Sequence, residues 1–417
     1  MNGLFVYGDF DWLESPLLIG QLGYESLRGS DSYSFCFDEN WLATYGNLML
    51  SADINNYVGT QYTQLGKDIF GCFSDVLPDR WGRTLLNRCE QIQAAEEKRP
   101  VRSLSSFDYL TGIDDFSRMG GFRFATERNG EFINSKENFR IPPLTDIRTL
   151  VVASMALERS EEKNLLPEKK WIQQLVLPGT SLGGARPKAG VVDESGKLYM
   201  AKFPSRKDDY DVALWEHHSH LLAKACGVVA AETRVINSGA KYHALLSLRF
   251  DRTHSGRRIH FASAMTLLGL SDGCDAKTGN GYLDIVDFIL QNCCDVSENL
   301  SQLFRRVAFN IAIGNSDDHF RNHGFVLTSR GWTLSPAYDM NPTLNNCQSL
   351  LINSSTNDAS LQILQDSCGE YMIAKNDACA IIEEVRQGVR QWETLAISLG
   401  ISKRERNMFA QVYNKTI

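Results

Sequence analysis

The segment IGNSDDHFRNHGF, residues 313–325, is followed by LSPAYDMNP, residues 334–342. Asp317 and Asn322 stand five positions apart in the first segment, and Asp339 lies in the second, after a stretch with a strand–turn–strand pattern. Carboxylate and amide oxygens suit Mg²⁺, which binds few protein groups and keeps water and phosphate oxygens as its other ligands. These segments therefore predict a magnesium site.

The spacing of Asp317 and Asn322 is that of the protein kinase catalytic loop, where the Asp engages a hydroxyl and the Asn holds a metal ion. The alternative is a zinc pair, because His319 and His323 stand at i and i+4 beside aspartates. No HExxH glutamate accompanies them, and Gly324 closes the stretch as a turn, which argues against a zinc hydrolase. Three more histidines are interpreted as structural or solvent-facing, because neighbouring positions of a helix do not share a face: His217, His218 and His220.

Two segments upstream indicate phosphate binding. Residues 180–188, TSLGGARPK, place paired glycines beside basic residues, so backbone amides can approach an anion closely. They lack the Walker A and dinucleotide spacings, and taken alone they are better explained by a tight glycine turn with surface charges. Lys202 lies in an apolar strand and Glu216 in the next helix, the arrangement by which kinases hold nucleotide phosphates. The alternative is an edge-strand lysine that faces solvent.

Local patterns predict the elements around these segments. Residues 1–75 are expected to form short strands and hairpins, with apolar stretches at 4–7, 17–22, 33–37 and 47–50. Asp79 is expected to cap a helix near 81–95, and Asn129-Gly130 is expected to turn a hairpin within 119–134. Consecutive prolines mark residues 141–144 as a linker.

Further elements are expected along the rest of the chain. They are a helix at 146–163, strands at 189–192 and 198–203 separated by a turn at 193–197, a helix at 208–225 stopped by Gly227, and strands at 233–237 and 243–249. The remainder is expected to be mainly helical, with one apolar face at Ile382, Val385, Val389 and Trp392.

Composition narrows the class of protein. The 417 residues are 43% hydrophobic and 22% charged, as in an ordinary globular protein of at least two domains or lobes. The net charge of −7 argues against dedicated nucleic-acid binding. No secretory signal and no membrane span is recognisable, and the ten scattered cysteines are expected to be reduced thiols, so a cytoplasmic protein without a membrane partner is predicted.

Taken in order, these motifs resemble the HipA family of serine/threonine kinases. The matching segments are SLGGARPKA (181–189), AKFPS (201–205), LRFDR (248–252) and the two segments quoted first, with DVLPDRWGR (75–83) and SRMGGFRF (117–124) near the N-terminus. The resemblance implies an α+β, bilobed protein-kinase-like fold related to the phosphoinositide 3/4-kinases. It implies an N-terminal α/β subdomain at 1–140, a kinase N-lobe with the glycine-rich loop at 145–250, and a mainly helical C-lobe at 251–417.

The resemblance also implies roles for individual residues. Asp317 would be the catalytic aspartate, Asn322 and Asp339 the magnesium ligands, and Ser181 a site of self-inactivating autophosphorylation. The residues that would bind ATP are Lys202, Glu216, Gly183, Gly184, Lys188, Arg249, Phe250, Asp251 and His319. Two positions depart from the family pattern: Leu248 stands where an acidic hinge residue can occur, and Arg186 where a glutamine can occur.

The function that follows is an ATP- and Mg²⁺-dependent protein serine/threonine kinase of the toxin–antitoxin type. Its substrate would be a translation-related protein such as an aminoacyl-tRNA synthetase. A small helix-turn-helix antitoxin is the expected partner, with DNA reached only through it. Two alternatives are a catalytically silent subunit of a DNA-bound repressor complex and a small-molecule kinase.

Overall fold

The computed structural model describes residues 2–27, 30–64, 66–135, 141–176, 186–345 and 347–414. Contacts divide the chain into two units. Unit 1 comprises Met1–Lys207, Ser238–Lys241 and Leu248–Ala262, and unit 2 comprises Asp208–Asn237, Tyr242–Ser247 and Ser263–Ile417. The three segments expected from the sequence have other boundaries, and that organisation stays a prediction.

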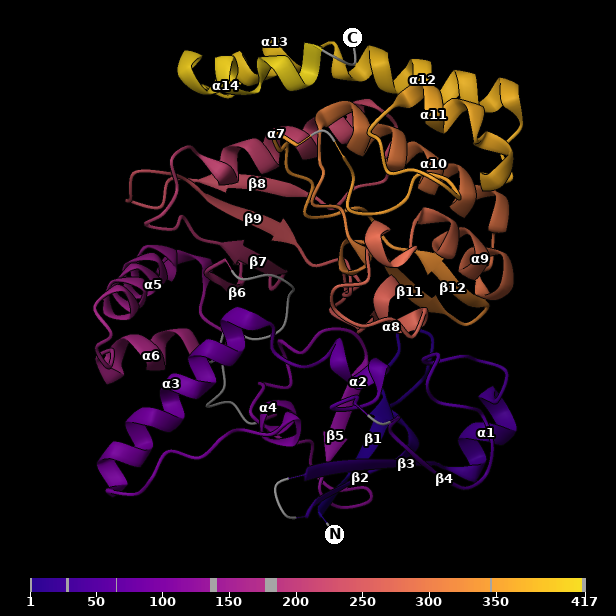
Figure 1. Cartoon of the computed structure of the whole chain (residues 1–417). Helices are drawn as coiled ribbons and strands as arrows, with labels where there is room; N and C mark the ends of the chain where they lie inside the picture. The colour runs from indigo at the N-terminus through magenta and orange to yellow at the C-terminus, as the bar shows by residue number, and fades with distance from the viewer. Residues whose placement is uncertain are drawn as a thin grey trace. The chain divides into compact units, whose positions relative to one another are not determined.

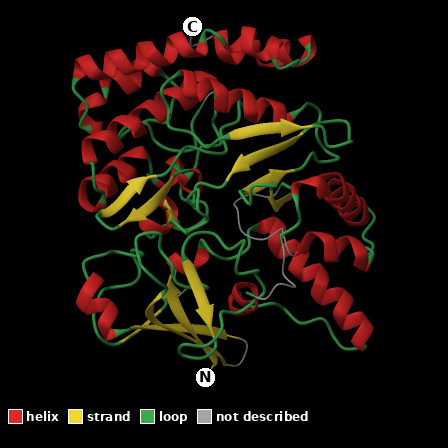
Figure 2. Ribbon diagram, turned by 180° about the vertical axis from the view of Figure 1, so that it is seen from behind, coloured by secondary structure: helices red, strands yellow, loops and turns green. Residues whose placement is uncertain are grey.

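A five-stranded antiparallel sheet begins unit 1, with the order β4-β3-β2-β1-β5 (Figure 1; strands yellow in Figure 2). Its strands are β1 (Asn2–Gly8), β2 (Leu17–Leu27), β3 (Ser30–Phe37), β4 (Thr60–Tyr62) and β5 (Phe122–Ala125). Phe73 packs against Phe35, Phe122 and Phe124, with ring centroids 5.6 to 6.0 Å apart. This buried aromatic face supplies the hydrophobic core that the sheet needs.

One expectation for this region is wrong. Residues 47–50 form a loop and not a strand, and the Leu48 carbonyl accepts a hydrogen bond from Nδ2 of Asn56 at 3.0 Å. The hairpin expected within 119–134 is present in a short form: an antiparallel bridge joins Ala125 to Phe132, and the Ile133 N–H donates to the Phe124 carbonyl at 2.8 Å. Its first arm, β5, pairs more extensively with β1, a partner that the sequence did not indicate.

Two helices of unit 1 lie where the sequence predicts them: α3 (Arg80–Glu97) and α5 (Ile147–Glu162). The other helical elements were not predicted, and the first two of them lie in the region expected to form strands and hairpins: α1 (Glu39–Tyr45), α2 (Gly71–Ser74), α4 (Ser106–Thr111), the 3-10 turn η2 (Leu144–Asp146) and α6 (Lys169–Val176). Asp79 caps α3 as predicted, its carboxylate accepting the Gly82 N–H at 2.8 Å. The proline segment is extended, but it is held in place and is no free linker, because the Pro142 carbonyl accepts the Val192 N–H at 3.2 Å.

Unit 1 also contains the predicted hairpin of β6 (Lys188–Val192) and β7 (Leu198–Lys202). The strand β10 (His260–Ser263) begins in the last segment of this unit, Leu248–Ala262. The Asp193 carboxylate closes the β6–β7 turn by accepting the N–H groups of Ser195 and Lys197, both at 2.9 Å. The turn at 193–197 is therefore confirmed.

Unit 2 is mainly helical, as predicted. It opens with α7 (Val212–Ala225), whose end is followed by Gly227 at φ +72°, and with the hairpin of β8 (Thr233–Ile236) and β9 (Ala244–Leu248). A second hairpin joins β11 (Gly324–Thr328) and β12 (Gly331–Leu334). The other elements are α8 (Ala264–Leu267), η3 (Ala276–Thr278), α9 (Tyr282–Asn292), α10 (Val296–Ile313), η4 (Phe320–Asn322), α11 (Leu361–Asp366), η5 (Cys368–Tyr371), α12 (Lys375–Val389), α13 (Trp392–Ser398) and α14 (Lys403–Asn414).

The long helix α10 is the core of unit 2, and α12 packs on it (Figure 1). Ile382, Val385 and Val389 of α12 are buried, as their spacing predicts, while Trp392 begins the next helix. The ten cysteines all lie in the described ranges and are free thiols. No described helix combines the length and apolarity needed to cross a bilayer.

Candidate active site

A glycine turn after α10 sets the course of the segment that holds Asp317. Gly314 has φ +66°, and a Cβ there would clash with Cγ1 of Val412 on α14. Both the backbone conformation and the space therefore require glycine. The Thr343 N–H and hydroxyl bind the Gly314 carbonyl at 3.0 and 2.8 Å, which fixes the turn further.

Asp318 is the buried anchor of the segment, with only 2% of its surface exposed. Its Oδ2 accepts three hydrogen bonds, from the Tyr282 hydroxyl at 2.6 Å, Nδ2 of Asn310 at 2.7 Å and Nε2 of His323 at 2.9 Å. Burial alone would raise the pKa of Asp318, but the charge and hydrogen bond of His323 outweigh it and hold the pKa below its ordinary value. The carboxylate therefore ties together both ends of the loop and two helices.

Asp317, the neighbour of this anchor, faces solvent. Within the described chain its carboxylate accepts no hydrogen bond, while its backbone carbonyl accepts Nδ2 of Asn322 at 3.0 Å. Burial raises the pKa of Asp317, and His319 opposes that rise. The negative charges of Asp339 and Asp318 raise the same pKa further. Two carboxylates that repel each other at the surface are a donor set that a cation would stabilise.

Asp339 follows the β11–β12 hairpin and has a left-handed backbone, with φ +56°. Aspartate tolerates this region better than most residues, but the conformation is uncommon outside glycine. The surrounding chain holds it in place: the Tyr338 hydroxyl donates to the Arg321 carbonyl at 2.6 Å, and Nδ2 of Asn341 lies 3.3 Å from Oδ1 of Asp339. The loop of Asp317 and the strained residue Asp339 thus belong to one ordered part of unit 2.

The alternative of a zinc pair at His319 and His323, against which the sequence argued, is not supported by the structure. Nε2 of His323 is bound to Asp318, and Nδ1 of His319 is buried without a hydrogen-bond partner. No cluster of three His, Cys, Asp or Glu side chains with metal-site geometry occurs among the described residues. Mg²⁺ needs fewer protein ligands than zinc and accepts amide oxygen, so the set Asp317, Asn322 and Asp339 suits it better.

In unit 1, Lys202 is buried at the end of β7, with 6% of its surface exposed, so the solvent-facing alternative is wrong. The strand register places Lys188 directly opposite it. Lys188 forms an ion pair with Asp79, Nζ to Oδ2 at 2.7 Å. Glu216 is buried on α7 in unit 2, and its pairing with Lys202 stays a prediction.

The predicted hinge segment lies in a buried ionic network of unit 1. Asp251 accepts the Gly120 N–H at 2.8 Å, Nε of Arg249 at 2.6 Å and Nη1 of Arg252 at 2.8 Å. Burial alone would raise the pKa of Asp251, but the charges of Arg249 and Arg252 outweigh it and hold the pKa well below its ordinary value. Phe250 packs on Phe261, with ring centroids 5.7 Å apart. The ATP contacts of these residues stay predictions.

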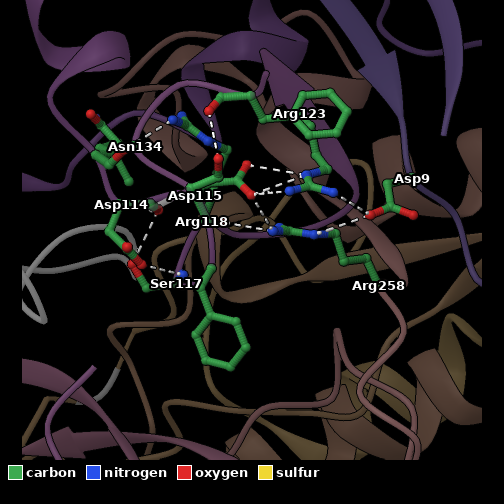
Figure 3. A network of polar contacts seen from close by, with 12 residues as sticks. Asp9, Asp114, Asp115, Ser117, Arg118, Arg123, Asn134 and Arg258 are labelled. Carbon is green, nitrogen blue, oxygen red and sulfur yellow. Dashed lines mark hydrogen bonds and ion pairs between the residues drawn. The ribbon is translucent and has the colours of Figure 1, made fainter. Parts of the chain in front are cut away.

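Figure 3 shows a second ionic cluster of unit 1 around Asp115. Its carboxylate pairs with Arg123 at 2.6 Å and Arg258 at 3.2 Å, and Asp9 pairs with the same two arginines. Sequence reasoning did not find this cluster. The available signal was the segment 117–124, in which Arg118 precedes the glycine pair and Arg123 interrupts the otherwise apolar strand Phe122–Ala125.

A family model described as the HipA-like C-terminal domain matches residues 180–392, more than half of the chain. The chain belongs to this family. The serine/threonine-protein kinase toxin HipA of Shewanella oneidensis is 24% identical over 224 residues, covering 48% of this chain and 50% of that protein. The chain spans about half the length of the curated relatives it matches.

The structure of HipA from Shewanella oneidensis MR-1, solved with HipB and its operator DNA, has the same fold. It superposes with a TM-score of 0.67 over 99% of this chain and 95% of that chain, at 17% sequence identity. The HipA-type, kinase-like α+β fold is therefore confirmed, including its N-terminal part.

Within the HipA-like domain lie Lys202, Asp317, Asn322 and Asp339. Ser181, Gly183 and Gly184 also fall in its range, but they lie outside the described residues. The described chain resumes at Arg186, whose Nε donates to the Phe203 carbonyl at 3.0 Å.

Proposed function

We propose that this HipA-like chain is a cytoplasmic, ATP- and Mg²⁺-dependent protein serine/threonine kinase. One observation carries the proposal: the Asp317 carboxylate is unpaired within the described chain, feels the charge of Asp339, and sits on a loop held by the buried carboxylate of Asp318. An exposed carboxylate on a rigid support is what a kinase needs to receive a hydroxyl proton.

The roles follow from the donor types. Asp339 and Asn322 would hold Mg²⁺, which when bound neutralises charge on the transferred phosphoryl group. Asp317 would orient the substrate hydroxyl and accept its proton, and Lys202 would hold the nucleotide phosphates. Because positioning and charge stabilisation supply most of the rate in such reactions, the fixed geometry of the loop is itself part of catalysis.

The finer parts of the proposal rest on the family. The substrate would be a serine of a translation-related protein such as an aminoacyl-tRNA synthetase, and Ser181 would be a site of autophosphorylation. The lobes would be related to the phosphoinositide 3/4-kinases. A small antitoxin would bind this chain as HipB accompanies HipA in the Shewanella complex, and the net charge of −7 fits a chain that reaches DNA only through that partner.

The test is incubation of the purified chain with radiolabelled ATP and Mg²⁺, with Asp317→Asn as the matched control. Label on the unmodified protein and none on the variant supports the kinase. Absence of label on both, together with absence of ATP binding, would show a catalytically silent subunit. Phosphoproteomics after induced expression identifies the protein substrate, and unchanged phosphopeptides would point to a small-molecule kinase.

A further inference from the structure

The N-terminus of α3 is joined to the start of β6 by two contacts. The Asp79 carboxylate caps α3 and also pairs with Lys188, Nζ to Oδ2 at 2.7 Å. The Trp81 indole donates from Nε1 to the Lys188 backbone carbonyl at 3.0 Å. The side chains of the ion pair are only 4% and 8% exposed, so the charges are paired away from water. One residue of β6 is thus held by both its side chain and its backbone.

That residue lies opposite Lys202. In an antiparallel pair, residues directly opposite each other project to the same face, so the side chains of Lys188 and Lys202 leave the sheet on the same face. Like charges in this arrangement repel, and a buried lysine needs a counterion. Asp79 supplies that counterion to Lys188 from a helix more than a hundred residues earlier in the chain.

The hairpin is also fixed at its open end. The Phe203 N–H donates to the Pro187 carbonyl at 2.8 Å, and Nε of Arg186 returns a bond to the Phe203 carbonyl at 3.0 Å. These bonds flank Lys188 and Lys202. The two lysines therefore sit on a rigid frame whose only charged support from α3 is Asp79, among the contacts described for that helix.

We propose that Asp79 and Trp81 are positioning residues for nucleotide binding. They hold Lys188 against α3 and thereby fix the position of the β6–β7 hairpin. Lys202, which lies opposite Lys188 on that hairpin, is then the lysine that contacts the nucleotide phosphates. The inference rests on the proposed kinase function and changes one detail of it: Lys188 anchors the strand and does not contact ATP. The segment DVLPDRWGR then has a role in nucleotide affinity without touching the nucleotide.

The test compares the ATP affinity of the unmodified protein with that of full-length variants, measured by calorimetry with Mg²⁺ present. Asp79→Asn leaves the Lys188 charge unpaired and should weaken ATP binding about ten-fold. Trp81→Phe removes one hydrogen bond and keeps the packing, so a loss of about three-fold is expected. The double variant Asp79→Asn with Lys188→Met removes both charges and should restore affinity to within about three-fold of the unmodified protein. Thermal melting confirms that each variant folds.

Recovery of ATP affinity in the double variant is the decisive result when the melting temperatures show that every variant is folded at the assay temperature, because the loss in Asp79→Asn then follows the unpaired charge of Lys188 and not unfolding. Lys202→Ala serves as the reference for the loss of a phosphate ligand. If Lys188→Met and the double variant both weaken ATP binding as severely as Lys202→Ala does, Lys188 is a phosphate ligand and the inference is wrong. Unchanged affinity in Asp79→Asn overturns it as well. If Asp79→Asn does not fold, the double variant and Trp81→Phe decide by the same criteria.

Failure of the proposed function would look different. An unmodified protein that binds no ATP overturns the kinase proposal and this inference with it. If the unmodified protein and Asp317→Asn both bind ATP, and Asp79→Asn binds it equally well, only the positioning role falls.

Discussion

Asp317 and Asp318 are adjacent in the chain but lie in opposite environments. Asp317 faces solvent with its carboxylate unpaired in the described structure, and Asp318 is buried beneath three donors. We expect Asp317→Asn to lower the phosphoryl-transfer rate about a thousand-fold or more without changing the melting temperature. Asp318→Asn should instead lower the free energy of unfolding by about 1–3 kcal/mol, because an amide cannot accept from all three donors. Single-turnover kinetics and thermal melting on the two variants separate these effects; equal melting temperatures would contradict the anchor role.

The sequence predicts Asp317 but not the role of Asp318. A pair of identical residues does not reveal which one is buried, because that depends on Tyr282 and Asn310, which come from α9 and α10. The spacing to Asn322 predicts Asp317 as the reactive member of the pair through its resemblance to kinases, and that role stays a prediction. The support beneath it required the tertiary structure.

Helix α7 carries a histidine whose protonation opposes folding. Burial lowers the pKa of His218 to about 4, although its Nε2 is bonded to the Trp392 carbonyl at 2.8 Å. The unfolded chain binds this proton near pH 6.5, whereas the folded chain does not until about pH 4. The free energy of unfolding should therefore fall as the pH decreases from 6.5 to 4, by up to about 3 kcal/mol from this residue.

Chemical denaturation at a series of pH values measures that slope. His218→Gln keeps a side-chain N–H for the Trp392 carbonyl and should flatten it, whereas His254→Gln, at an exposed position, should leave it unchanged. Equal slopes for His218→Gln and the unmodified protein would rule out the assignment.

Elements whose limits depend on neighbouring residues were predicted well. Asp79 starts α3 and Gly227 follows the end of α7, because capping is decided within one turn of helix. The partner of β5 was missed because β1 lies more than a hundred residues earlier, and an Asn-Gly turn cannot exclude a distant strand. Long-range pairing is the part of this fold that local patterns do not determine.

The whole molecule should be stabilised by its nucleotide. A ligand that binds only the folded state at a hundred times its Kd adds about 2.7 kcal/mol. For units of this size, that corresponds to a rise in melting temperature of roughly 5 °C or more. We expect ATP to give the full rise in melting temperature only when Mg²⁺ is present. Asp339→Ala should lose the part of this rise that depends on Mg²⁺, and Lys202→Ala should lose most of the whole rise. Differential scanning calorimetry measures the shift, and an identical rise in the presence of a chelator would argue against the metal site.

The length of the chain predicts at least two domains or lobes, and the structure has two units. How the chain is divided between the two units was not predicted. Residues 238–241 and 248–262 return to unit 1 after the chain has entered unit 2. Polar contacts hold the second stretch in unit 1: Asp251 accepts the backbone N–H of Gly120, and Arg258 forms an ion pair with Asp115. These buried partners are far apart in sequence, so neither composition nor periodicity could indicate them.

Under the proposed kinase function, the close packing of Val412 on Gly314 would give the C-terminal helix an indirect part in the reaction. The turn that leads to Asp317 packs against α14, so a protease that removes the last fifteen residues would remove this contact and loosen the loop. Such trimming would act as an irreversible off-switch, reached without touching the chemistry itself. An affinity tag is accordingly better placed at the N-terminus, and limited proteolysis that removes α14 should abolish phosphoryl transfer while ATP binding persists.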